Sequence, residues 1–187
     1  MLKAFTFPAA ASLAVLMLAE TATAQSVTVL GGGMARQCSN AALDGESDRK
    51  FEAVCTMAIQ TEILSNTDRA GTYVNRGVLR LRRSEYLDAR ADFDVALGLK
   101  SNLAEAYVNR GAALVGQRRY ADGLADLNKA LELGVDEPEK AYFNRALAHE
   151  GLDDMKQAYF DYRKALELSP EWEAPRKELA RFTVQMR

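Results

Sequence analysis

The sequence predicts an all-α protein built as a solenoid of helical hairpins, because two phrases recur along it at a nearly constant step. The phrase Tyr-Val-Asn-Arg-Gly at residues 73–77 returns at residues 107–111 and, as Tyr-Phe-Asn-Arg-Ala, at residues 142–146. These steps are 34 and 35 residues long. Self-similarity at this period is typical of stacked helix pairs, whose extended concave surface favours binding over catalysis. A second phrase, Ala-Leu-x-Leu, keeps the same step and begins at Ala96, Ala130 and Ala165.

Residues 1–24 have the pattern of a secretory signal peptide. Lys3 precedes an apolar stretch, residues 5–18, and a small-x-small cleavage pattern ends at Ala24. The apolar stretch is shorter than the roughly 20 residues of a membrane-spanning helix, although an uncleaved anchor is the alternative. We expect cleavage after Ala24, so that Gln25 begins the mature chain. This predicts an exported protein, and the signal type and the fold together favour a bacterial periplasm over the extracellular space.

Composition excludes some classes of partner. The formal net charge of −2 does not change when the signal segment is removed, because that segment carries one lysine and one glutamate. Such a balance predicts neither nucleic-acid binding nor attraction to an anionic membrane. No later segment of the sequence is long and apolar enough to span a bilayer, so we expect no stable membrane insertion after signal cleavage.

The mature chain should begin with a flexible leader and a degenerate hairpin. The leader, residues 25–35, contains three consecutive glycines at residues 31–33 and lacks a helical pattern. The hairpin, residues 36–67, combines a short helix, a turn at residues 44–47 and a longer helix. Terminal repeats are usually atypical because one side faces solvent, so we expect this hairpin to cap the stack. The apolar stripe of the longer helix comprises Phe51, Val54, Cys55, Ala58, Ile59 and Ile63.

Two cysteines, Cys38 and Cys55, fall one on each helix of this hairpin. In an oxidising compartment such a pair predicts a structural disulfide. A metal site would need more ligands, and the only histidine, His149, is remote in sequence. We therefore expect a disulfide, no metal and no cofactor.

Three regular hairpins should fill residues 68–169, as repeats 68–101, 102–138 and 139–169. Their internal turns fall at residues 82–85, 116–119 and 151–154, where Gly116 and Gly151 are expected to end helices in a left-handed conformation. Pro170 breaks the chain, and residues 170–187 should form a capping helix near residues 175–186.

The spaced residues of these hairpins resemble the tetratricopeptide repeat. The resemblance covers about residues 68–187, and Gly123 and Met155 depart from it where alanine and an aromatic residue are usual. It implies that the first helix of each hairpin lines a concave groove, and that an asparagine row can hold an extended peptide. The positions that carry the resemblance are Tyr73, Tyr107, Tyr142, Gly77, Gly111, Ala146, Tyr86, Tyr120, Ala89, Ala158, Ala96, Ala130, Ala165 and Pro170.

On this basis the groove is expected to be mainly apolar, with one asparagine at the same height in each repeat. An amide offers both a donor and an acceptor to a peptide main chain, although local hydrogen bonds within the stack are the alternative. The sparse cations argue against a clamp for a C-terminal carboxylate. The expected groove residues are Val74, Asn75, Val78, Val108, Asn109, Ala112, Lys140, Phe143, Asn144 and Leu147.

An arginine follows each of these asparagines, and an aspartate lies 16 residues after each arginine. The spacing predicts ion pairs across each hairpin, which fix register rather than grip an acidic partner. The expected pairs are Arg76 with Asp92, Arg110 with Asp126, and Arg145 with Asp161.

No catalytic pattern accompanies these repeats. Residues 47–50 match Ser-x-x-Lys, but the partner motifs are absent and Ser47 is better placed to cap a helix. We therefore predict a non-enzymatic adaptor that binds an extended segment of a protein or peptide partner. The alternatives are a self-associating scaffold of the cell envelope, which would form homo-oligomers, and more remotely a hydrolase.

Overall fold

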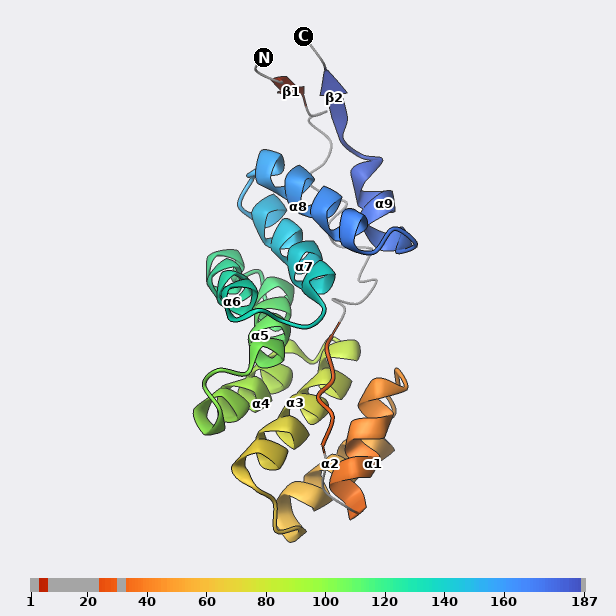
Figure 1. Ribbon diagram of the computed structural model, residues 1–187, viewed down its shortest axis with the longest axis vertical. Helices are drawn as coiled ribbons and strands as arrows, with labels where there is room; N and C mark the ends of the chain where they lie inside the picture. Colours follow the sequence, from red (N-terminus) through yellow and green to blue (C-terminus); the bar gives the residue numbers. More distant parts are fainter. Residues whose placement is uncertain (1–3, 7–23, 30–32, 186–187) are drawn as a thin grey trace.

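The computed structural model describes residues 4–6, 24–29 and 33–185 of the 187-residue chain. Within these residues the fold is a column of antiparallel helix pairs, which confirms the all-α prediction (Figure 1). The helices are α1 (Gly33–Leu43), α2 (Arg49–Thr61), α3 (Asn66–Arg82), α4 (Tyr86–Leu99), α5 (Ala104–Gly116), α6 (Tyr120–Leu133), α7 (Pro138–Gly151), α8 (Met155–Leu168) and α9 (Glu173–Leu179). Two short strands, β1 (Ala4–Thr6) and β2 (Thr183–Gln185), pair antiparallel at the chain ends.

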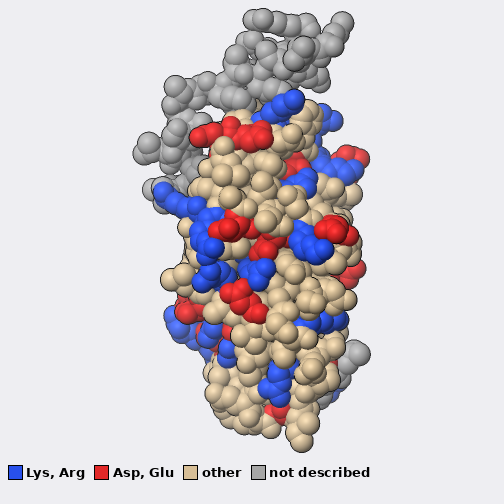
Figure 2. Space-filling model, turned by 90° about the vertical axis from the view of Figure 1, so that its left-hand side faces the viewer, with Lys and Arg blue, Asp and Glu red and all other residues tan. Residues whose placement is uncertain are grey.

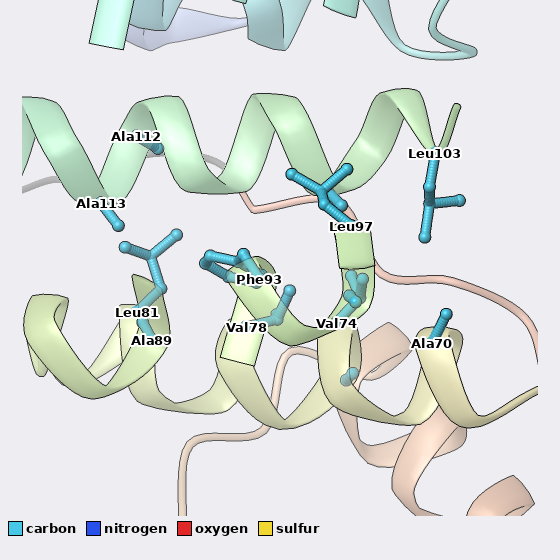
Figure 3. Packing of buried hydrophobic residues seen from close by; sticks show 13 residues of the cluster. Ala70, Val74, Val78, Leu81, Ala89, Phe93, Leu97, Leu103, Ala112 and Ala113 are labelled. Atoms are coloured by element: carbon cyan, nitrogen blue, oxygen red, sulfur yellow. The ribbon is translucent and has the colours of Figure 1, made fainter. Parts of the chain in front are cut away.

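Consecutive helices pack against each other, and the first helices α1, α3, α5 and α7 also contact one another in order. The core extends along the stack as successive buried clusters: the first lies mainly between α3, α4 and α5, the second between α5, α6 and α7, and the third between α7 and α8. Figure 3 shows one part of it, where Phe93 of α4 lies between α3 and α5. A Cβ atom added at Gly77 would lie 2.5 Å from Cε1 of Phe93, so the small residue at this position lets the ring enter the hairpin.

The first hairpin carries the predicted staple. Cys38 of α1 and Cys55 of α2 form a disulfide, and both residues are fully buried beside Leu79 of α3. The hairpin is therefore cross-linked internally and packed on the next repeat. Its stripe is shorter than predicted, because Ile63 lies beyond the end of α2 and is fully exposed. The chain leaves the helix at Glu62, whose carboxylate accepts hydrogen bonds from the first amides of α1.

The turns inside the hairpins correct a second prediction. The left-handed residues are Ser84, Arg118 and Asp153, each with φ of 60°, and not Gly116 or Gly151. Each glycine instead ends a first helix at a close contact with a tyrosine ring of the preceding hairpin. For Gly116 an added Cβ atom would lie 2.5 Å from Cε1 of Tyr86. Packing between repeats, not backbone freedom, explains these glycines.

The C-terminal segment differs from the single helix expected at residues 175–186. Helix α9 ends at Leu179, and β2 follows. After α9 the chain folds back over α8, where the ring of Phe182 lies 5.8 Å from that of Tyr159 and 6.1 Å from that of Tyr162. These contacts bury an aromatic ring that a continuing helix would carry away.

Candidate functional site

A segment of the chain itself lies on the concave face of the stack. Residues 24–29, here called the strap, cross α5, α3 and α1 as an extended segment, drawn in red-orange in Figure 1. The strap falls within the predicted leader, residues 25–35, and α1 already begins at Gly33. The prediction of a flexible leader was therefore wrong for these residues, because their main chain and side chains have specific partners.

Two of the three predicted asparagines hold the strap main chain. Asn109 Oδ1 accepts a hydrogen bond of 2.8 Å from the amide of Gln25, and its Nδ2 donates one of 2.7 Å to the carbonyl of the same residue. Asn75 makes the same pair of bonds to Val27, at 2.8 Å and 2.7 Å. Each amide thus satisfies one whole peptide residue, and one repeat advances the strap by two residues.

The far end of the strap is held by a serine that the sequence analysis did not single out. Ser39 of α1 accepts a hydrogen bond of 3.3 Å from the amide of Val29 and donates one of 3.0 Å to the carbonyl of Val27. At the other end, Nε2 of Gln25 donates to the carbonyl of Glu137, just before α7, at 2.7 Å. The strap therefore runs in the direction opposite to the order of the repeats.

From Gln25 to Val29, alternate side chains of the strap enter the fold. Gln25 and Val29 are buried, Val27 packs on the first core cluster, and Thr28 is exposed. This period of two is that of an extended chain with one buried side. An added Cβ atom at Gly71 of α3 would lie 3.1 Å from a methyl carbon of Val27 and 3.1 Å from one of Val29. The missing side chain at Gly71 makes the space for both valines.

The third asparagine of the row has no such occupant. Asn144 occupies on α7 the position that Asn75 and Asn109 occupy on α3 and α5, and it is fully buried. Neither its Nδ2 nor its Oδ1 has a hydrogen-bond partner in the part of the chain that the structure describes. We call Asn75, Asn109 and Asn144 the asparagine row. Two of its members are occupied and one is open.

The other predicted groove residues divide between the groove and the core. Val74 and Val78 belong to the buried cluster on which Val27 packs. Phe143 instead packs inward, with its ring 5.5 Å from that of Tyr162 and 4.9 Å from that of Trp172. The remaining four have interior or local partners: Ala112 lies in the first core cluster, Val108 in the second, Leu147 against the third, and Lys140 pairs with Glu137.

The structure brings together all three predicted arginine–aspartate pairs. Each arginine uses Nε and one terminal nitrogen to bind both oxygens of its aspartate. The distances are 3.0 and 2.6 Å for Arg76 with Asp92, 2.7 and 2.8 Å for Arg110 with Asp126, and 2.7 and 2.7 Å for Arg145 with Asp161. Bidentate pairing of this kind fixes the relative position of two helices.

The remaining terminal nitrogen of each arginine reaches the preceding hairpin, which the sequence analysis did not foresee. Its acceptors are Thr56 of α2, Asp94 of α4 and Asn128 of α6, at 3.1, 2.8 and 2.8 Å. Each guanidinium also lies over the tyrosine three residues earlier, at 5.1–5.3 Å from the ring centroid. One side chain therefore joins two helices of its own repeat and one of its neighbour. The recurrence of Asp94 and Asn128 at a step of 34 residues was the available signal.

The ion pairs shift the pKa values of Arg76, Arg110 and Arg145, here called the arginine row, upwards. Hydrogen bonding to Asp126 raises the pKa of Arg110, and Asp161 does the same for Arg145. Burial raises the pKa of Asp92, while Arg76 and Arg80 lower it. Two guanidinium groups therefore face this one buried carboxylate.

Charge of either sign is mixed on the side of the molecule that carries α4 and α6. Figure 2 shows basic and acidic side chains next to one another there, without a broad region of one sign. No group of three or more metal-ligating side chains occurs among the described residues. In the same part of the chain, no helix is long and apolar enough to cross a membrane.

The sequence analysis missed the strap, although a signal was present. Val27, Thr28 and Val29 alternate apolar and polar β-branched residues, which indicates an extended segment with one buried side. The three following glycines outweighed this short pattern. Local sequence patterns also offer no means of identifying Ser39 or Gly71, since the roles of these residues depend on where the strap lies.

Comparisons with known proteins agree with this architecture. Residues 139–171 match the model of the tetratricopeptide repeat. The TPR domain of Arabidopsis OM64 is similar at 26% identity over 63% of this chain and 96% of that one, with a TM-score of 0.59. A search of curated proteins found no match to the sequence.

Two further solved structures share the fold. The first TPR of Spaghetti (RPAP3), bound to the HSP90 peptide SRMEEVD, is 24% identical over 64% of this chain and 94% of its own, with a TM-score of 0.57. MamA from Desulfovibrio magneticus RS-1 is 22% identical over 79% and 82%, with a TM-score of 0.62. The family match thus covers one repeat, residues 139–171, and the solved structures share the fold of the stack.

Proposed function

We propose that this protein is a non-enzymatic adaptor that binds an extended segment of another protein along the asparagine row. The tetratricopeptide fold is one that mediates protein–protein contacts, and one of its structural neighbours was solved with a bound peptide. The observation that carries the proposal is the pairing of Asn75 and Asn109 with the strap. Both amides bind main-chain groups alone, so they can hold a chain of varied sequence.

The chemistry of the groove favours a main-chain grip over recognition of a terminal carboxylate. Lys140 pairs with Glu137 at 2.6 Å, and Arg82 donates to the carbonyls of Ala42 and Glu46. Both of these cations are thus already engaged. An internal, mainly apolar segment of a partner is the better match.

The test is an affinity pull-down from the envelope of the cells that make the protein. Natural protein would be compared with an Asn75→Ala/Asn109→Ala/Asn144→Ala variant and, as a control, with Asn102→Ala in an exposed turn. A partner retained by the natural protein and the control, but lost by the still-folded triple variant, is the expected result. Equal retention by all three would place binding elsewhere. Retention by none, together with concentration-dependent sedimentation, would favour a self-associating scaffold.

We also propose that the protein is exported, with a bacterial periplasm as its compartment. The N-terminal pattern supports this, and so does a buried disulfide between the only two cysteines. The predicted signal peptide, residues 1–24, falls mostly outside the described residues, which include β1 and Ala24 from it. Intact mass of the protein from a periplasmic fraction should correspond to a chain that begins at Gln25. A mass that retains residues 1–24 would contradict cleavage.

A further inference from the structure

The occupied and open members of the asparagine row differ in a way that bears on regulation. The strap satisfies Asn75 and Asn109 through Val27 and Gln25, two residues apart. A longer bound segment that kept this step would bring the main-chain groups of its preceding alternate residue to Asn144. That asparagine is fully buried, and neither of its amide atoms has a partner in the described structure. A buried amide without partners costs free energy that a bound peptide would recover.

We propose that the strap is a built-in competitor for the groove, and that a partner peptide displaces it by also engaging Asn144. This inference rests on the proposed function and specifies its ligand. The peptide spans at least seven residues in extended conformation and runs from α7 towards α1. Its main chain pairs with all three asparagines. It therefore makes two more hydrogen bonds to the asparagine row than the strap makes through Gln25 and Val27.

The strap also indicates which side chains the partner carries. At the positions of Val27 and Val29, the gap over Gly71 accepts branched aliphatic side chains. At the position of Gln25, a side chain with an N–H donor reaches the carbonyl of Glu137. The position of Thr28 is exposed, so it tolerates polar and charged residues. The preferred ligand is therefore a strand-forming segment with alternating aliphatic residues at its C-terminal end.

Competition within one chain lowers apparent affinity by a simple factor. If the groove is free of its strap for only a fraction of the time, the apparent dissociation constant of a peptide rises by the inverse of that fraction. A substitution that weakens the strap should therefore tighten binding without touching the groove. Val27→Pro is suited to this, because it removes the amide that donates to Asn75. Thr28→Pro is the matched control, since residue 28 is exposed in the same extended segment.

The probes are two acetylated, amidated peptides titrated into the intact purified protein, whose N-terminus is first fixed by mass. One has the sequence of residues 23–29, Thr-Ala-Gln-Ser-Val-Thr-Val, and the other that of residues 25–29. The seven-residue peptide should bind the Val27→Pro protein about tenfold more tightly than the natural protein or the Thr28→Pro control. In the Val27→Pro background, Asn144→Ala should weaken the seven-residue peptide about fivefold and leave the five-residue peptide unchanged.

Each outcome bears on one of the two proposals. Equal binding to natural and Val27→Pro proteins would overturn the competitor role, while the groove itself would still bind peptide. No binding to any variant, alongside a partner whose retention depends on the asparagines, would also overturn it and leave the proposed function intact. A natural protein that dimerises, and that Val27→Pro converts to a monomer, would overturn it by assigning the strap to the groove of a second copy.

Discussion

Two rows of polar side chains run the length of this molecule, and they differ in what satisfies them. Asn75, Asn109 and Asn144 are each followed directly by an arginine. Consecutive helical residues point about 100° apart, so the asparagines face the concave side while the arginines face the second helix of the hairpin. The arginines bind aspartates that belong to the folded stack. The two occupied asparagines bind the main chain of the strap, which is not one of the helices of the stack.

The difference separates a structural row from a binding row. Arg110 uses all three of its guanidinium nitrogens within the fold: two bind the oxygens of Asp126, the third binds Asp94 of the preceding hairpin, and the group lies over the ring of Tyr107. An asparagine bonded only to strap main chain can exchange that partner for another of identical chemistry. Periodic polar residues in a repeat protein are therefore best judged by whether their partners can leave.

The largest effect should come from breaking the arginine row where it is most buried. Asp92→Ala should destabilise the protein by about 3 kcal/mol, because Arg76 and Arg80 would lose their shared, buried carboxylate. Urea unfolding followed by circular dichroism measures this loss. Asp94→Ala is the control, since that exposed carboxylate is a secondary partner of Arg110, and it should cost under about 1 kcal/mol. Equal losses in both variants would contradict a structural role concentrated in the hairpin pairs.

A charge exchange should sharpen this conclusion with an intermediate effect. Arg110→Asp and Asp126→Arg should each cost about 2–3 kcal/mol, and the double variant should recover at least about 1 kcal/mol of the summed loss. Recovery will be partial, because Arg110 also reaches Asp94 and lies over Tyr107. Strictly additive losses in the double-mutant cycle would refute a direct pairing.

The arginine row could be predicted from sequence because its geometry is local. A hairpin of two regular helices places residues 16 apart at the same height. The spacing between Arg76 and Asp92, which recurs in the later repeats, therefore predicts their contact. The disulfide between Cys38 and Cys55 was accessible for the same reason. In both cases the two partners share one hairpin, and the helical period alone brings them together.

The strap could not be predicted in the same way, because its partners lie on three different hairpins. Gln25 and Asn109 are separated by 84 residues, and no periodicity links a single extended segment to a helical repeat. An error at one helix end has the same origin. Ile63 continues the apolar period of α2, but Glu62 has already left the helix to bind the amides at the start of α1. Tertiary contacts prevailed over the local pattern at these points.

A substitution beneath the strap should have a smaller effect than either change in the arginine row. Gly71→Ala places a methyl group 3.1 Å from side-chain carbons of Val27 and Val29, so the strap must shift or leave. Gly98→Ala is the matched control, because its added methyl group meets nothing within 4 Å in helix α4. The free energy of unfolding of Gly98→Ala should rise by up to about 1 kcal/mol, because alanine favours a helix more than glycine does. Gly71→Ala should show no such gain, because the added methyl group displaces the strap. Hydrogen exchange at the Val27 amide should accelerate only in Gly71→Ala; equal protection would mean the valines do not need this space.

The smallest expected effect distinguishes the members of the asparagine row from one another. Asn75→Ala removes two hydrogen bonds to Val27 and should cost about 1 kcal/mol. Asn144→Ala removes a buried amide that has no partner in the described structure, so stability should change by less than about 0.5 kcal/mol or rise. Thermal and urea unfolding of the two variants, without added peptide, give the comparison. A loss at Asn144 as large as that at Asn75 would mean that this position is already satisfied and that the groove has no open member.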